Sequence, residues 1–211
     1  MKPALLILGL LPLLSAPADQ PSQQASPDRI AALETRIEKL EKQLAPLLQQ
    51  QAYLNQARKE PTRARQRILA DNDRYTRDQL RTIETLYNQA SLDWTSPEAK
   101  QILQTLQTRF PKANRTGCAR LRHALQLNGN KKIDQLQQII QHHSNSYFPD
   151  GVHIESFARF ALNLEYRKAG NTTAAEKQIQ ALRQNHPHAI DHQGRLLLDH
   201  LDDLEAILPS P

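Results

Sequence analysis

Apolar residues recur at alternating intervals of three and four positions along the chain from Asp28 onward. This is the a/d spacing of a heptad repeat, which places the apolar side chains in one stripe along a helix. It predicts a coiled-coil oligomerisation segment over residues 28–58, interrupted at Pro46 because proline removes a backbone hydrogen bond and crowds the preceding turn. The stripe and its two flanking charges are Ile30, Leu33, Arg36, Ile37, Leu40, Glu41 and Leu44.

Arg36 and Glu41 occupy the g and e positions beside this stripe. An Arg at g covers the apolar seam with its methylenes, and its guanidinium reaches a Glu on a neighbouring helix. The pattern resembles that of short parallel trimeric coiled coils, whereas Ile at a with Leu at d favours a dimer. We expect a homo-oligomer, a trimer in preference to a dimer. Packing of the stripe on the chain's own domain is the alternative.

Regularly spaced prolines mark a second helical region that begins near Tyr75. Pro111, Pro149 and Pro187 each follow a Phe or His residue, lie 38 residues apart and are predicted to close a helix. Gly-Asn pairs at 129–130 and 170–171 separate the predicted partner helices. The pattern predicts a helix–turn–helix repeat.

Two helix starts within the repeats carry recognisable caps. Ser96 precedes Pro97, which combines an N-cap residue with a proline at the first helical position. Thr173 with Glu176 fits a capping box. The chain is therefore expected to be all-α, with a basic connector over 59–72 and a repeat domain over 73–208. The repeat domain is expected to contain about three helix pairs and a capping helix over 195–208.

The stretches EAKQILQTLQTRFPKA (98–113) and AAEKQIQALRQNHPHA (174–189) carry a small residue early in the second helix and Pro at its end. This arrangement resembles the tetratricopeptide repeat. The period is longer than the usual 34 residues, and the aromatic signature of the first helix is absent. The resemblance implies an α-solenoid that buries one face of each helix pair against its neighbours.

The first 18 residues have the composition of a secretory signal. Lys2 precedes an apolar run too short to span a bilayer, and Ala16-Pro17-Ala18 supplies the small residues of a cleavage site. Cleavage after Ala18 is predicted to release a periplasmic protein with a flexible spacer over 19–27 and no stable membrane insertion. The formal net charge falls from +5 to +4 with the loss of Lys2.

The order of signal peptide, coiled coil, polar connector and helical repeats resembles the periplasmic coordinator family of the Tol–Pal system (YbgF/CpoB-like). The FPKA and YFPD segments are similar to the helix ends of that family's repeats. The resemblance implies a trimer that binds an envelope partner through its repeats and helps to coordinate outer-membrane constriction with peptidoglycan synthesis.

First-helix side chains line the concave surface of such a solenoid. Arginines on that surface would suit an acidic peptide or a C-terminal carboxylate of an envelope protein, through bidentate hydrogen bonds. Solvated arginines on the outer face are the alternative. The candidate partner-binding residues are Arg81, Asn88, Arg120, Arg122, Arg159, Asn163 and Arg167.

Other chemistry has weaker signals. His188 and His192 could hold zinc or copper if their segment is helical, but no established ligand spacing surrounds them. Glu155-Ser156 resembles the catalytic start of lytic transglycosylases, without the glycine-rich stretch of those enzymes. Cys118 is the only cysteine, so no disulfide framework is expected.

The sequence therefore predicts a non-enzymatic scaffold without a cofactor. Nucleic-acid binding is disfavoured by export and by the lack of aromatic residues among the basic ones. A metal- or anionic-polymer-binding envelope protein is the alternative, followed by a peptidoglycan-acting enzyme.

Overall fold

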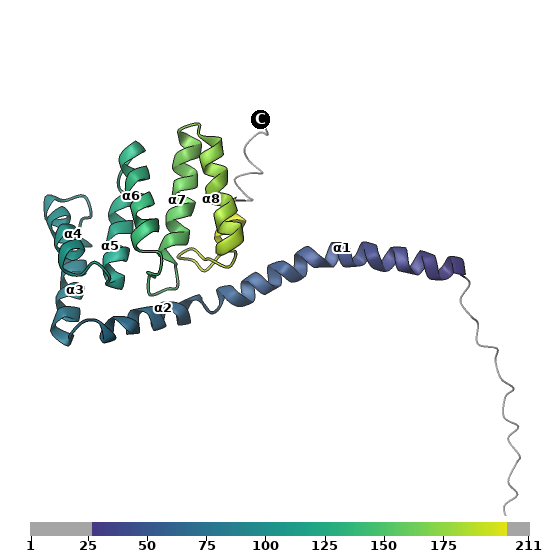
Figure 1. Cartoon of the computed structure of the whole chain (residues 1–211), viewed down its shortest axis with the longest axis horizontal. Coiled ribbons are helices and arrows are strands. Elements are labelled where there is room, and N and C mark those ends of the chain that lie inside the picture. The colour runs from purple at the N-terminus through teal and green to yellow at the C-terminus, as the bar shows by residue number, and fades with distance from the viewer. Residues whose placement is uncertain (1–26, 202–211) are drawn as a thin grey trace, which may run out of the picture. The chain divides into compact units, whose positions relative to one another are not determined.

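The computed structural model describes residues 27–201, and within this range the regular structure is helical except for two isolated β-bridges (Figure 1). The all-α prediction is confirmed. The predicted signal peptide (1–18) and the predicted spacer up to residue 26 lie outside the described residues. No helix within 27–201 has both the length and the apolar character that a bilayer span requires.

The chain forms two compact units, residues 1–45 and 46–211. Helix α1 (Pro27–Ala57) contributes to both. The helical backbone continues through Pro46, so the predicted interruption of the helix is wrong. A proline inside a helix costs roughly 3 kcal/mol, but Gln43, Leu44 and Ala45 before it and Leu47 and Leu48 after it all favour helix.

Three helix pairs follow one another along the second unit, as the repeat pattern predicted (Figure 1). Buried apolar side chains of α3, α4 and α5 form one core cluster, those of α5, α6 and α7 form a second, and the half-buried Tyr87 packs against both. Residues 197–201 begin a further helix, and the rest of the predicted capping helix lies outside the described residues. The pairs are α3 (Arg77–Ala90) with α4 (Pro97–Arg109), α5 (Asn114–Leu125) with α6 (Gly129–His142), and α7 (Ile154–Lys168) with α8 (Thr172–Asn185).

The repeat register differs from the prediction in the middle unit. The C-cap residues of α4, α6 and α8 are Phe110, His143 and His186, each donating its N–H to the carbonyl four residues earlier. The middle helix therefore ends 33 residues after the first and 43 before the third. Phe148 and Pro149, predicted to close the middle helix, lie instead in the loop that follows it.

That loop and the loop after α8 are both 11 residues long, and each is pinched by one antiparallel bridge. Tyr147 pairs with His153, and Ile190 pairs with Leu196. The loop after α4 has only four residues. The longer loop after α6 accounts for most of the difference between the 33-residue and 43-residue intervals.

The segment predicted as a basic connector is folded. It contains α2 (Glu60–Leu69) and a 3₁₀ helix, η1 (Ala70–Asp73), and it buries Glu60, Ala64 and Asp71. We call residues 46–74 the strap. The strap belongs to the same compact unit as the repeats, so this unit begins at Pro46 and not after the predicted connector over 59–72.

The strap crosses all three loops between successive repeats, in reverse chain order. Tyr53 and Ala57 pack on Ile190 and Leu196 of the last loop. The backbone at Pro61 lies so close to Gly151 in the middle loop that a Cβ there would be 2.8 Å from its nitrogen. Farther along, Arg67 and Arg74 donate to the Lys112 carbonyl in the first loop. The strap therefore ties the ends of the repeats together.

The predicted helix starts are confirmed in one case and corrected in the other. Ser96 caps α4 by accepting a hydrogen bond from the Ala99 N–H at 3.0 Å, with Pro97 at the first helical position. The N-cap of α8 is Asn171, which accepts from the Ala174 N–H. Thr173 lies within the helix, so the predicted capping box is wrong.

Candidate functional site

A cleft of about 630 Å³ opens where the strap crosses the loops after α4 and α6. Arg63, Arg67 and Arg74 reach it from the strap, and Lys112 reaches it from the first loop. No Asp or Glu lines this cleft, and its opposite wall is polar, with Ser144 and other residues of the middle loop. The cleft is therefore a concentrated positive surface of the repeat unit.

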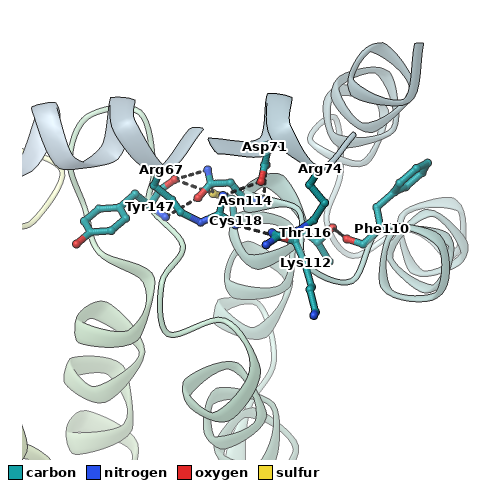
Figure 2. Close-up of polar contacts among 9 residues, drawn as sticks. All are labelled: Arg67, Asp71, Arg74, Phe110, Lys112, Asn114, Thr116, Cys118 and Tyr147. Atoms are coloured by element: carbon teal, nitrogen blue, oxygen red, sulfur yellow. Dashed lines mark hydrogen bonds and ion pairs between the residues drawn. The ribbon is translucent and has the colours of Figure 1, made fainter. Parts of the chain in front are cut away.

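The Asp71 carboxylate fixes the strap beside the cleft (Figure 2). One oxygen accepts from the Arg67 guanidinium at 2.6 Å, and the other accepts from the Asn114 N–H at 2.7 Å. Asn114 is the first residue of α5, whose own N-cap residue, Ala113, offers no side-chain acceptor. Asp71 thus supplies from the strap the cap that α5 lacks, and its negative charge is favoured at a helix N-terminus.

The same network extends to the middle loop (Figure 2). The Asn114 side chain donates to the Tyr147 carbonyl and accepts from the Tyr147 N–H, both at 2.8 Å. The hydroxyl of Thr116 donates to the Phe110 carbonyl at 2.7 Å. These bonds link the backbones of two loops to one helix end, so the walls of the cleft are held before any ligand arrives.

A second pocket of about 370 Å³ adjoins the cleft and shares Lys112, His142 and His143 with it. Arg120 of α5 also lines it, although its side chain is buried. Its Nη2 donates to the Gln138 side-chain oxygen at 2.8 Å and to that of Gln135 at 3.3 Å. Its buried Nε has no partner, and no carboxylate within residues 27–201 forms an ion pair with it.

Burial lowers the pKa of Arg120 below its usual value. It also lowers the pKa of His143 to about 4, and the Arg120 charge adds to that effect. His143 is therefore neutral at physiological pH. The positive charge of the pocket comes from Arg120 and Lys112, and the imidazole adds only hydrogen-bonding capacity.

The seven predicted partner-binding residues do not gather on one exposed groove. Arg120 and Asn163 are buried, so the expectation that they are exposed is wrong. Asn163 donates to the Ala175 carbonyl of α8 at 3.0 Å, which holds α7 against its partner helix. Arg81 and Asn88 are exposed on α3.

The remaining three arginines are half-buried. Arg159 bonds to Glu155 and to Gln178 of α8, and Arg122 stacks on the Phe148 ring with its guanidinium carbon 4.6 Å from the ring centre. Arg167 lines a shallow pocket beside the start of α8. Of the seven, only Arg120 contributes to the basic cleft and its neighbouring pocket.

Arg63, Arg67, Arg74 and Lys112 were not among the predicted site residues. Arg63 and Arg67 fall in the segment predicted as a basic connector, Arg74 lies just after it, and Lys112 follows a helix-closing proline. The run of positive charge was a visible signal, but only the folded strap shows that it faces the repeat loops.

The predicted metal pair does not form. His188 and His192 lie in the loop after α8, so they do not share a helix face. His188 contacts Glu60 at 3.2 Å, whereas His192 contacts Asp150 at 2.6 Å. Within residues 27–201 no group of three or more His, Cys, Asp or Glu side chains is arranged to hold a metal ion.

The other candidate groups are held in structural contacts. The Cys118 thiol is buried, donates to the Tyr147 carbonyl, and has its pKa raised to about 12 by burial. Ser156 is buried and bonds to the His153 ring at 2.7 Å. Burial raises the pKa of Glu155, but hydrogen bonds from His186 and Arg159 outweigh it and lower that pKa to about 2. None of these side chains faces a described cleft.

The predicted oligomerisation residues lie on α1, and the apolar ones are exposed. Ile30, Leu33, Ile37, Leu40 and Leu44 are between 47% and 54% exposed, which is unusual for five aliphatic side chains on one helix face. Arg36 and Glu41 are exposed beside them. The single chain therefore leaves this stripe uncovered.

Comparison of the chain with protein-family models, with curated proteins and with solved structures gave no match.

Proposed function

We propose that this protein is an exported, non-enzymatic scaffold that self-associates through α1 and binds an envelope protein through its repeat unit. The observation that carries the proposal is the exposed aliphatic stripe of α1, joined in one chain to a folded helical-repeat unit. Aliphatic side chains at heptad spacing are stabilised when copies of the helix pack together. Arg36 and Glu41, on opposite sides of the stripe, supply complementary charges for a neighbouring copy.

The periplasmic location rests on the signal-like sequence of residues 1–18. The resemblance to the Tol–Pal coordinator family suggests a role in coordinating envelope processes during cell division. Several copies of one binding surface would raise avidity for a partner without any new contact. A trimer is the assembly that the Arg36–Glu41 pattern favours.

Multi-angle light scattering of the mature chain, starting at Asp19, tests the assembly. The wild type should have the mass of a trimer, and Ile37→Asp should lower it to that of the monomer, because a carboxylate would enter the apolar seam. Leu92→Asp is the matched control, since Leu92 is 88% exposed on the repeat unit and its replacement should leave the mass unchanged. A monomeric wild type would refute self-association.

Affinity purification tests the partner. The mature chain, immobilised, should retain a Tol–Pal component from an envelope extract, and the monomeric Ile37→Asp variant should retain less of it through lost avidity. Recovery of no such component would refute the link to that system.

A second candidate function, binding of an anionic envelope polymer, is favoured by the basic cleft. Sedimentation with purified cell-wall sacculi distinguishes it. A polymer-binding protein would sediment with the sacculi, and loss of that sedimentation on adding salt would show that charge drives it.

A further inference from the structure

We propose that the basic cleft and the adjoining pocket form one site for an acidic peptide segment, in which Arg120 and Lys112 hold a carboxylate. This inference rests on the proposed function, because it assigns the surface on which the partner protein docks.

Arg120 is the first reason. Its guanidinium is buried, its Nε is unpaired, and no carboxylate among residues 27–201 neutralises it. A buried charge without a counter-ion is costly, and proteins rarely retain one in a purely structural position. Because Arg120 lines the pocket and Lys112 lies beside it, a ligand carboxylate there would supply the missing counter-ion.

The second reason is the distribution of charge along the site. Arg63, Arg67 and Arg74 line the cleft next to the pocket, with no acidic side chain in either lining. Part of this charge is neutralised, because Arg63 forms an ion pair with Glu60 and Arg67 forms one with Asp71. Arg74 and Lys112 have no such acidic partner among the described residues, so they remain available for further carboxylates.

The shape and polar groups favour an extended peptide over a compact anion. The cleft and pocket are contiguous through Lys112, His142 and His143. Ser144, Asn145 and the glutamines of the pocket add neutral donors and acceptors that suit peptide groups between acidic side chains. Tyr147 is the only Phe, Tyr or Trp among the described residues that line the cleft and pocket, so the site offers few platforms on which nucleic-acid bases could stack.

The site is also held in place before binding. The Asp71 and Asn114 bonds fix the strap and the middle loop on either side of it. A site whose walls are already ordered loses less conformational entropy when a flexible peptide binds.

The test is fluorescence anisotropy of a labelled hexaglutamate peptide titrated with the mature chain at low ionic strength. Arg120→Met and Lys112→Gln should each weaken binding about tenfold or more, because each removes a charge-assisted hydrogen bond to a carboxylate. Arg81→Gln is the control, since Arg81 is exposed on α3 outside the site, and should change affinity less than twofold. Equal affinities for all four proteins would overturn the proposal.

Thermal melting separates binding from a structural role of Arg120. Without peptide, Arg120→Met should melt at or above the wild-type temperature, because an uncompensated buried charge is removed. Peptide should raise the melting temperature of the wild type but not that of Arg120→Met. A variant that melts lower and still binds peptide with wild-type affinity would overturn the proposal. If Arg120→Met fails to fold, exposed Lys112→Gln decides through the same titration.

Competition identifies the ligand class. Unlabelled hexaglutamate should displace the probe at concentrations where inorganic phosphate and vesicles of phosphatidylglycerol do not. Displacement by phosphate or vesicles at equal charge concentration would overturn the peptide assignment.

Ile37→Asp should bind the probe with unchanged affinity per chain. Unchanged binding by a wild type that proves monomeric would leave the cleft proposal standing while refuting assembly. A wild type that is trimeric but does not bind the probe would refute the cleft proposal and leave self-association standing.

Discussion

Replacement of Asp71 by Ala should weaken the attachment of the strap to the start of α5. Asp71 is buried, and its carboxylate accepts two hydrogen bonds, from Arg67 on the strap and from the Asn114 N–H at the start of α5. Ala removes both acceptors, leaves the Arg67 guanidinium without its anion, and leaves the first turn of α5 without a cap. The effect should therefore be larger than that of a surface ion pair.

The magnitude follows from the burial of the pair. Side-chain exposure is 17% for Arg67 and 8% for Asp71, and breaking a buried pair costs about 3–5 kcal/mol. Arg67 keeps its bond to the Lys112 carbonyl at 2.8 Å, which favours the lower end, about 3 kcal/mol. For a folded unit of this size that corresponds to a fall of about 6 to 12 °C in the melting temperature.

Differential scanning calorimetry of the mature chain measures this fall. Asp71→Asn keeps an oxygen that can accept from the Asn114 N–H, so it should lose about half as much. Arg67→Gln combined with Asp71→Ala should cost less than the sum of the two single changes, because the pair is already broken. A shift below about 2 °C for Asp71→Ala, or strict additivity in the double variant, would show that this contact does not hold the strap.

Two further predictions concern pH and the contact between strap and middle loop. Burial lowers the pKa of His143 and of His153 to about 4 from an ordinary 6.5. Between pH 6.5 and 4 the unfolded chain therefore binds more protons than the folded chain. The free energy of unfolding should fall as pH drops through this range, by up to about 3 kcal/mol for each histidine. Urea unfolding across this range checks it; a flat profile, or an unchanged slope in His143→Gln, would contradict it. Gly151→Ala should destabilise the unit by roughly 2–4 kcal/mol, because φ is +100° and the new Cβ would meet the Pro61 backbone. Gly194→Ala, with φ of +80° and open space around it, should cost only about 1–2 kcal/mol, and equal losses in the same unfolding assay would refute the close contact.

Local patterns in the sequence were sufficient to predict α1 and the helix pairs of the repeats, but not α2 or η1 of the strap. The heptad spacing identified α1 and its stripe, and Ser96-Pro97 identified the start of α4. Hydrophobic periodicity and caps are local properties, so the sequence alone reveals them. Pro46 led to the wrong prediction of a helix interruption. Its local penalty of about 3 kcal/mol is outweighed by the helix-forming residues around it.

The helix ends in the repeats depended on contacts between distant residues. The middle helix ends at His143, whereas the sequence pattern predicted an end at Phe148-Pro149. The spacing of prolines does not reveal that these residues lie in an 11-residue loop folded back by the Tyr147–His153 bridge. The cap of α5 comes from Asp71, 43 residues before Asn114. Such a cap leaves no trace in the residues next to the helix.

The sequence by itself determined that the chain is helical, repetitive and provided with an amphipathic N-terminal stripe. Only the tertiary structure decided that residues 58–67 are part of a strap and that the charges facing the cleft meet Lys112 and the pocket of Arg120. The physical reason is that helix formation follows from neighbours within a few turns. A binding surface depends on which distant side chains packing brings together and on which charges it leaves without a counter-ion.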